Sequence, residues 1–343
     1  MFGLTMALRL RRSIRHFLML LSLVPALAFG AGPQQESAPA QATPPSQTNP
    51  SAQGNPQSQP GGAAPAAAPG EANAAAQKVI EDDAEYKAYM AAANTQDPRE
   101  QAEAMESFVQ RYPKSVVAAV ALERAMWDWQ SAGDTVKVLE VAKELLTVDS
   151  GNVRALAVVV ALDRVSAAQG DSAALDEVCR YSTAGMREVA MWQKPTGMAD
   201  ADFASLNKQM GAIFNSAAGY CALEQRNFSQ ARDWFTRAVE ADATDVQNLY
   251  DLAIADLELT PMDANGFWYC AKAIQLAKSS ATAGAAGGME GYCKPKYETY
   301  HGSLQGWDAI LSASATQNAL PAGFASGIKP AGAPAATAQP KRK

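Results

Sequence analysis

The chain has 343 residues, 48% of them hydrophobic, and its formal net charge is −6. An acidic chain without a basic stripe binds nucleic acid poorly, because phosphate contacts dominate that affinity, so we expect no nucleic-acid partner. The two histidines, His16 and His301, are too few for a histidine metal cluster, and no phosphate-loop, nucleophile-elbow or Cys-x-x-Cys pattern is present. We therefore expect no catalytic residue, metal or cofactor, and a protein that is not an enzyme.

Residues 1–30 have the pattern of a cleavable export signal. Four arginines precede an apolar run from Phe17 to Phe29, and small residues at its end offer cleavage sites. The run is shorter than the about 20 residues that a membrane-spanning helix needs. We expect a periplasmic or secreted protein with no transmembrane span in the mature chain, and an uncleaved anchor is the alternative.

Residues 31–77 are predicted to be a disordered linker. They contain nine of the 19 prolines and no leucine, isoleucine, valine or aromatic residue. Such a segment cannot bury enough apolar surface to offset the entropy lost on ordering. The folded part is expected to span residues 78–324, and residues 325–343 are expected to form a disordered tail.

From residue 78 onward, apolar residues recur at helical spacing without a convincing alternating strand, which predicts an all-α fold. The clearest unit covers residues 212–245. Its small residues, such as Gly219, allow two antiparallel helices to approach closely, while Phe228 and Phe235 fill the space around them. The sequence therefore predicts a tightly packed helix pair in this unit.

The same phase continues on both sides of that unit. Residues 246–279 form a second clear repeat, and upstream turns at Gly133 and Gly170 mark further helix pairs. A long helix is expected from about residue 202 to 225, and Gly287 is expected in a connector rich in alanine and glycine. About five antiparallel helix pairs are predicted, and an irregular helical bundle is the alternative.

Four cysteines, Cys179, Cys221, Cys270 and Cys293, would meet an oxidising compartment after export. They predict one or two disulfides, with Cys270 and Cys293 the nearest pair along the chain. Alternatively, they act as small buried apolar side chains on helices.

The unit at 212–245 resembles a tetratricopeptide repeat (TPR), whose period is about 34 residues. The matching residues are Gly219, Phe228, Ala231, Phe235, Ala238 and Asp242. More narrowly, residues 78–324 resemble exported bacterial TPR proteins without an assigned activity, on the run from Asn265 to Tyr269 and the ending from Lys296 to Trp307. The resemblance implies a TPR-like α-solenoid with a C-terminal cap that binds a peptide or protein on its concave face.

In TPR proteins the first helix of each pair lines the concave face. The resemblance therefore implies a groove lined by Ser216, Tyr220, Glu224, Gln247, Tyr250, Asp251, Ile254 and Glu258. This aromatic and acidic lining would suit a peptide with apolar and basic side chains, although Tyr220 and Tyr250 could instead pack between helices. We hypothesise that alanine at both 250 and 251 weakens partner capture without lowering the melting temperature.

A second candidate site lies near the end of the helical region, where Tyr297, Tyr300, His301 and Trp307 cluster. These rings could stack on a sugar or a peptide aromatic, which would make the protein a glycan- or peptidoglycan-binding accessory module. We favour the structural interpretation, in which they form the cap that covers the last repeat. The leading functional hypothesis is a non-enzymatic protein–protein interaction scaffold with a protein or peptide partner in the bacterial cell envelope.

Overall fold

A computed structural model of the chain describes residues 80–195, 197–280 and 282–332. These residues fold into helices and contain no β-strand, which confirms the predicted all-α fold. The predicted signal at 1–30, the linker at 31–77 and positions 333–343 of the predicted tail lie outside the described residues.

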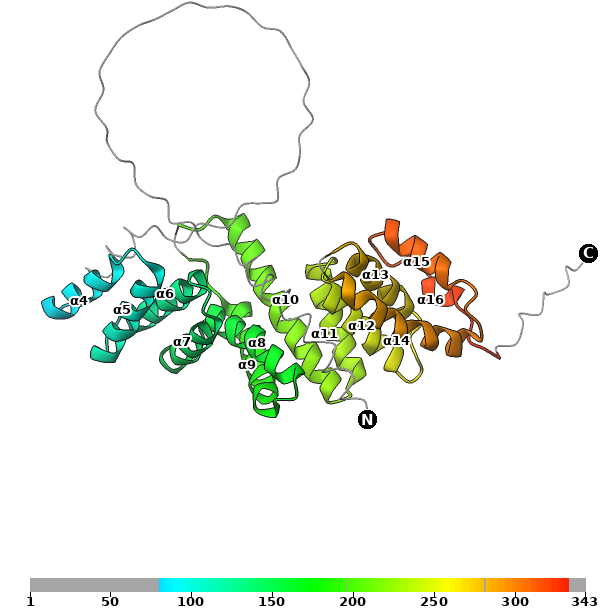
Figure 1. Ribbon diagram of the computed structural model, residues 1–343, viewed down its shortest axis with the longest axis horizontal. Coiled ribbons are helices and arrows are strands. Elements are labelled where there is room, and N and C mark those ends of the chain that lie inside the picture. Colours follow the sequence, from blue (N-terminus) through cyan, green and yellow to red (C-terminus); the bar gives the residue numbers. More distant parts are fainter. Residues whose placement is uncertain (1–79, 196, 281, 333–343) are drawn as a thin grey trace, which may run out of the picture.

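The helices form a row that runs from α4 at one end to α14, α15 and α16 at the other (Figure 1). From α4 to α14 each helix packs against the next one along the chain, and α15 packs against α13. In addition, α8 contacts α10, and α10 contacts α12. The bounds are α4 (Asp83–Ala93), α5 (Pro98–Arg111), α6 (Ala118–Ser131), α7 (Thr135–Val148), α8 (Val153–Ala168), α9 (Ser172–Met191), α10 (Asp200–Glu224), α11 (Phe228–Ala241), α12 (Val246–Glu258), α13 (Gly266–Lys278), α14 (Ala283–His301), α15 (Trp307–Thr316) and α16 (Phe324–Gly327).

Every second turn in the middle of the row has the same construction. These are the turns between α6 and α7, between α8 and α9, and between α10 and α11. In each, a residue with positive φ is followed by a side chain that caps the next helix by accepting a backbone N–H hydrogen bond. The residue pairs are Gly133-Asp134, Gly170-Asp171 and Arg226-Asn227. Two of these turns lie where the sequence predicts them, and the third occupies the matching place in the 212–245 unit.

Two glycines allow neighbouring helices to touch. A Cβ atom added to Gly219 on α10 would lie 2.8 Å from the ring of Phe235 on α11, as the sequence predicts for this pair. At Gly185 on α9, an added Cβ would lie 2.2 Å from the ring of Phe214 on α10. Any larger residue at either position would therefore force the two helices apart.

Buried apolar side chains fall into three clusters rather than one. The N-terminal core extends from Ile80 to Cys221, and the C-terminal core extends from Leu249 to Ile328. Between them lies a small cluster made of Ala222, Ala231, Phe235, Leu252 and Ala255. Because α10 contributes to the N-terminal core and to this small cluster, and α12 contributes to the small cluster and to the C-terminal core, these two helices connect the two ends of the row.

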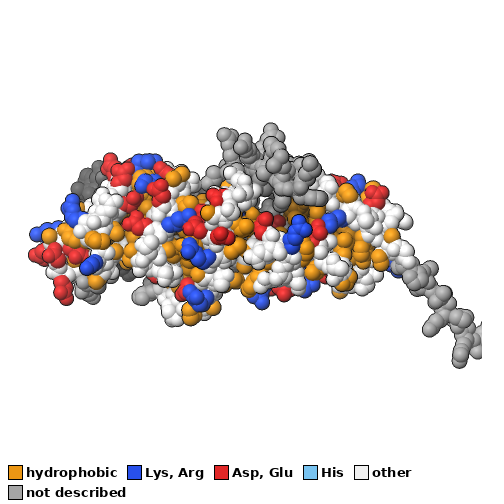
Figure 2. Space-filling view, turned by 90° about the horizontal axis from the view of Figure 1, so that it is seen from below, with side chains coloured by type: hydrophobic (Ala, Val, Ile, Leu, Met, Phe, Trp, Pro, Cys, Tyr) orange, Lys and Arg blue, Asp and Glu red, His pale blue; other side chains and the backbone are white. Residues whose placement is uncertain are grey.

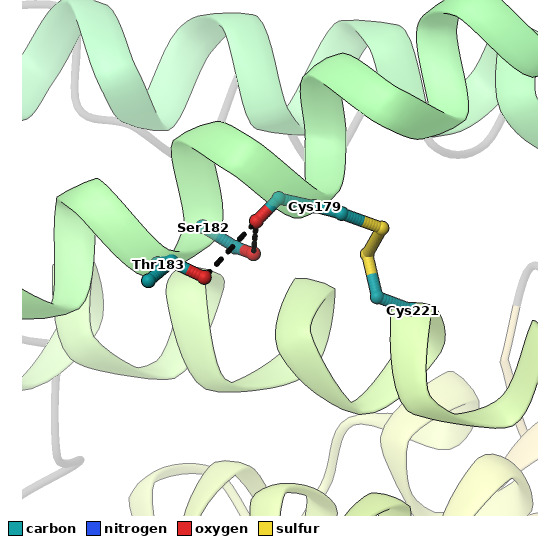
Figure 3. Close-up of a disulfide and its surroundings, with 4 residues drawn as sticks. All are labelled: Cys179, Ser182, Thr183 and Cys221. Atoms are coloured by element: carbon teal, nitrogen blue, oxygen red, sulfur yellow. Dashed lines mark hydrogen bonds between the residues drawn. A yellow bond between two sulfur atoms is a disulfide. The ribbon is translucent and has the colours of Figure 1, made fainter. Parts of the chain in front are cut away.

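Both pairs of cysteines form disulfides. Cys270 on α13 bonds Cys293 on α14 with a Cα–Cα distance of 6.2 Å, and Cys179 on α9 bonds Cys221 on α10 with a Cα–Cα distance of 5.7 Å. The second bond lies beside a turn of α9 in which the hydroxyls of Ser182 and Thr183 donate to the Cys179 carbonyl (Figure 3). Each disulfide joins two helices that are consecutive in the row, so neither bridges the two large cores.

Surface charge differs along the row. A group of acidic side chains lies at the α4 end with basic side chains beside it, and charges of both signs are also intermixed farther along the face in Figure 2. Asp83 and Glu85 lie in the first turn of α4, where the positive end of the helix dipole favours them. None of the helices among the described residues is both long and apolar enough to span a membrane.

Two expectations about the C-terminal region need correction. Gly287 lies inside α14 rather than in a connector, because the helix continues through its alanine- and glycine-rich first half. The predicted tail also begins too early, since Ile328 is buried in the C-terminal core and the Ala331 amide donates to the Tyr300 carbonyl at 2.6 Å. A single apolar residue in a polar, glycine-rich stretch gives little signal, so only its tertiary contacts reveal this extension.

Candidate interaction face

The eight predicted groove residues lie on two helices that contact each other, α10 and α12. We call the surface formed by these residues, together with the α8 and α14 side chains that contact them, the first-helix face. Three of the eight residues belong to one polar network. Ser216 and Asp251 are buried in it, and Tyr220 is less deeply buried. The other five lie at its edge or nearer to α14.

Arg164 of α8 is the centre of that network. Its guanidinium donates to the Asp251 carboxylate of α12 at 2.9 Å and to the Ser216 hydroxyl of α10 at 2.6 Å. It also lies 5.1 Å from the centroid of the Tyr220 ring, within range of a cation–π interaction. One side chain thus connects three helices, and we call this set of contacts the Arg164 clasp.

Further hydrogen bonds complete the clasp. The Ser216 hydroxyl donates to the Asn248 side-chain oxygen, and the Gln247 amide donates to the second Asp251 oxygen at 2.8 Å. Both oxygens of the Asp251 carboxylate are therefore occupied, as a buried charge requires. Sequence analysis missed Arg164 and Asn248, although a charged pair, Asp163-Arg164, in the otherwise apolar second half of α8 is a signal that could have found the arginine.

Burial controls the ionisation of the clasp. Asp251 is only 3% exposed, and desolvation raises its pKa to about 6, although Arg164 and Gln247 both oppose the shift. Desolvation also raises the pKa of Tyr220, and the nearby Glu224 carboxylate adds to the effect. The tyrosine is therefore a neutral side chain at any ordinary pH, and Asp251 is the clasp member that titrates in mildly acidic solution.

A second cluster extends the face to α14. The Tyr292 hydroxyl donates to Glu258 at 2.8 Å, and the Lys296 ammonium lies 2.8 Å from the same carboxylate oxygen. Lys296 also lies 5.3 Å from the Tyr292 ring centroid, and Tyr250 packs edge-on against Tyr292 at 6.0 Å. The face is thus continuous over α8, α10, α12 and α14.

Depth separates the predicted residues into two groups. Glu224 and Gln247 are exposed, and Tyr220, Tyr250, Ile254 and Glu258 are partly buried, so these six keep contact with solvent. Ser216 and Asp251 are buried and hold helices together. Contrary to the hypothesis from the sequence, we therefore expect alanine at 250 and 251 to lower the melting temperature, because loss of the Asp251 carboxylate leaves the partly buried Arg164 without its ion-pair partner.

Of the four terminal aromatics, Tyr297 and Trp307 are buried in the C-terminal core, whereas Tyr300 and His301 are partly buried and Tyr300 also lines a pocket next to the loop that precedes α13. Trp307 is 1% exposed and Tyr297 is 3% exposed, with their ring centroids 5.4 Å apart. The Tyr297 hydroxyl donates to the Gln305 carbonyl at 2.7 Å, and His301 Nδ1 lies 2.9 Å from the Lys329 carbonyl. Tyr300 contacts Phe267 with ring centroids 5.7 Å apart. These contacts favour the cap and give no support to glycan stacking, because Tyr297 and Trp307 have no free ring face.

Asp163 and Asp256 are other buried acids, and neither belongs to a metal site. Asp163 pairs with Lys143 at 3.1 Å, and Asp256 lies near Asp263 and Arg232. Across the described ranges, no three histidine, cysteine, aspartate or glutamate side chains gather closely enough to hold a metal ion. The burial of Asp163 and Asp256 affects the stability of the fold instead.

No protein-family model matches the chain, and no significant match is found among curated proteins. The resemblance to TPR proteins therefore rests on the sequence alone, chiefly on residues 212–245.

Proposed function

We propose that this protein is a protein–protein interaction scaffold built as a TPR-like α-solenoid. In this proposal α4 to α13 make five antiparallel helix pairs, and α14 to α16 form the cap. Packing of each helix on the next, with extra contacts between α8, α10 and α12, supports this architecture, because solenoid repeats contact mainly their neighbours. The pattern of residues 1–30 supports the proposal that the protein works in the periplasm or outside a bacterial cell.

The observation that carries the proposal is the continuous first-helix face. Its polar and aromatic contacts link α8, α10, α12 and α14 without interruption, which is what a long peptide or protein ligand would need. Arg164 neutralises Asp251, and Lys296 neutralises Glu258, so Glu224 is the exposed acid of this face. We therefore propose a partner segment with apolar side chains for Tyr250 and Ile254 and a basic side chain for Glu224.

Site-specific crosslinking tests this proposal. A photo-crosslinking residue in place of Ile254, which is partly buried on α12, should capture the same envelope protein in repeated experiments. The matched control is Asp233 on α11, which is exposed but lies outside the first-helix face. Glu224→Lys should reduce the capture at least about tenfold if a basic side chain meets this acid, since like charges repel across an interface. Equal capture from positions 254 and 233, or none from 254, would refute the proposed site.

A further inference from the structure

A cavity of about 440 Å³ opens in the C-terminal half of the row. Four elements line it: α11 with Arg232, the loop between α12 and α13, α14 with Tyr300, and α16 with Ala325. These elements lie in the right-hand part of Figure 1. The lining includes none of the eight predicted groove residues, so the cavity is a candidate site separate from the first-helix face.

The cavity combines an apolar lining with two charged side chains of opposite sign. Asp263 supplies the negative charge and Arg232 the positive one. One oxygen of the Asp263 carboxylate accepts a backbone N–H two residues farther along the chain at 2.9 Å, and no hydrogen bond within the described residues occupies the other. The apolar part of the lining includes Leu259, Pro261, Met262 and the ring of Tyr300.

A third charged side chain lies next to the cavity. Asp256 on α12 is 2% exposed, and its Oδ1 has no hydrogen-bond partner among the described residues. The Asp256 carbonyl accepts the Asp263 N–H at 3.0 Å, and the Asp256 Cβ lies 2.9 Å from a Cβ built on Gly266. The side chain is therefore enclosed between the loop and the start of α13. The charged side chains that act on its carboxylate are Asp263 and Arg232, which both line the cavity.

Arg232 does not neutralise both acids. It forms an ion pair with its neighbour Asp233 at 3.4 Å, and its side chain is 38% exposed. Two carboxylates, Asp256 and Asp263, and one guanidinium leave a net negative charge at the cavity. In apolar surroundings such a charge acts over several ångströms and attracts a counter-ion. The cavity therefore favours a cationic ligand over a neutral or anionic one.

The lining favours an organic cation rather than a metal ion. A hard metal ion needs several oxygen ligands, and no three histidine, cysteine, aspartate or glutamate side chains gather within the part of the chain that the structure describes. Apolar walls instead provide a surface for methylene groups, as they do for the stems of lysine and arginine side chains. The ring of Tyr300 adds the attraction of an aromatic face for a cation.

We propose that this cavity binds an organic cation, an ammonium or guanidinium group carried on an alkyl chain. The cation lies beside the Asp263 carboxylate, and its methylene groups pack against Met262 and the Tyr300 ring. Asp256 supplies a second negative charge from behind the wall. In the empty cavity this buried acid only destabilises the fold, whereas with a cation bound it strengthens binding. The site does not depend on the partner that we propose for the first-helix face.

Binding of n-butylammonium to the full-length chain, measured by ligand-observed NMR at pH 9, tests the site. Burial, with the Asp263 charge adding to it, raises the pKa of Asp256 to about 8, so the carboxylate is charged at this pH. The amine keeps its proton there, as a lysine does. n-Butanol is the neutral control of the same chain length. We expect saturable binding of the cation and none of the alcohol. Equal binding of both, or no binding of the cation, would overturn the proposal.

Three variants assign the binding to the cavity. Asp256→Asn removes the buried charge at nearly constant volume and should weaken n-butylammonium binding at least about tenfold. Arg232→Ala removes the competing cation and should strengthen binding about threefold or more. Arg237→Ala makes the same change of charge on the same helix, where the guanidinium stacks on Trp234 instead of lining the cavity, and should leave binding unchanged.

The opposite signs expected for the first two variants separate a binding role from a structural one. The fold does not need the Asp256 charge, so weaker binding by Asp256→Asn would not reflect unfolding, and thermal unfolding of each variant checks this. Unchanged binding by Asp256→Asn, or weaker binding by Arg232→Ala, would overturn the proposal.

A second probe distinguishes the two sources of such a cation. Nα-acetyl-lysine amide carries the ammonium group on a peptide-like backbone. Tighter binding of this probe than of n-butylammonium would support a lysine side chain of a protein, and weaker binding would support a small free amine. Crosslinking from position 254 does not involve the cavity, so failure of either experiment leaves the other proposal standing.

Discussion

At the scale of single residues, the buried charges of this protein are satisfied in different ways. Asp251 has a cation and an amide on its two oxygens, whereas one Asp256 oxygen has no hydrogen-bond partner among the described residues. Within the part of the chain that the structure describes, Lys272 on α13 pairs with no acid, and its ammonium donates to the carbonyls of Ser314 and Gln317 and to the side-chain oxygen of Asn318. These acceptors lie at the C-terminal end of α15, where the helix dipole favours a positive charge.

Lys272→Met should lower the free energy of unfolding by about 2–4 kcal/mol, because it removes three hydrogen bonds and leaves the carbonyl of the buried residue Ser314 without this donor. Chemical denaturation measures the change. Lys278→Met is the matched control on the same helix, since its partly exposed ion pair with Glu290 spans 3.6 Å. We expect the control to change stability by less than about 0.5 kcal/mol. Equal losses in both variants would contradict the assigned role of Lys272.

At the scale of helices, close packing depends on where glycine is placed. Gly185 faces the ring of Phe214, whereas no atom of a neighbouring element lies within 4 Å of a Cβ built on Gly211, which is also inside a helix. Helix propensity opposes glycine at both positions. Only at Gly185 does the contact between α9 and α10 compensate for that loss.

Alanine at these two glycines should therefore have opposite effects. Gly185→Ala should destabilise the protein by about 1–3 kcal/mol, because the methyl group overlaps the Phe214 ring. Gly211→Ala should stabilise it by about 0.5–1 kcal/mol through helix propensity alone. Thermal unfolding monitored by circular dichroism measures both changes. A destabilised Gly211→Ala variant would mean that this helix face is covered.

At the scale of the whole molecule, buried aspartates set the dependence of stability on pH. Burial raises the pKa of Asp128, Asp163 and Asp251 to about 6 each, and burial together with the Asp263 charge raises that of Asp256 to about 8. An acid whose pKa is higher in the folded state binds its proton more tightly there. Stability should therefore increase as the pH falls from about 8 toward 5.

The melting temperature should accordingly be higher at pH 5 than at pH 8. Asp256→Asn should stabilise the protein by about 2–4 kcal/mol at pH 8 and by less at pH 5. The gain is smaller at pH 5 because Asp256 of the wild-type protein is already protonated there. Differential scanning calorimetry at both values measures this. A melting temperature that rises from pH 5 to pH 8 would show that the buried acids are ionised without penalty, contrary to their burial.

Local patterns determined the helical content of this protein. Spacing of apolar residues predicts the all-α fold, the Gly-Asp pairs predict two turns, and Gly219 predicts the close approach of α10 and α11. These features depend on residues within about 20 positions of each other, so they can be inferred from the chain itself. The eight candidate residues come from the resemblance to TPR proteins, and the structure shows that the two helices that carry them contact each other.

Only the tertiary structure determines how deeply the eight candidate residues are buried and which side chains they contact. Arg164 and Asp251 are 87 positions apart, and their contact depends on the way α8, α10 and α12 pack. Helical position predicts a direction around the helix axis but not the depth at which the neighbouring helices bury a side chain. The sequence therefore does not distinguish exposed Glu224 from buried Asp251. Nor does it distinguish an aromatic pocket from the packed cap around Trp307. Long-range packing separates them because it determines which polar groups lose contact with water.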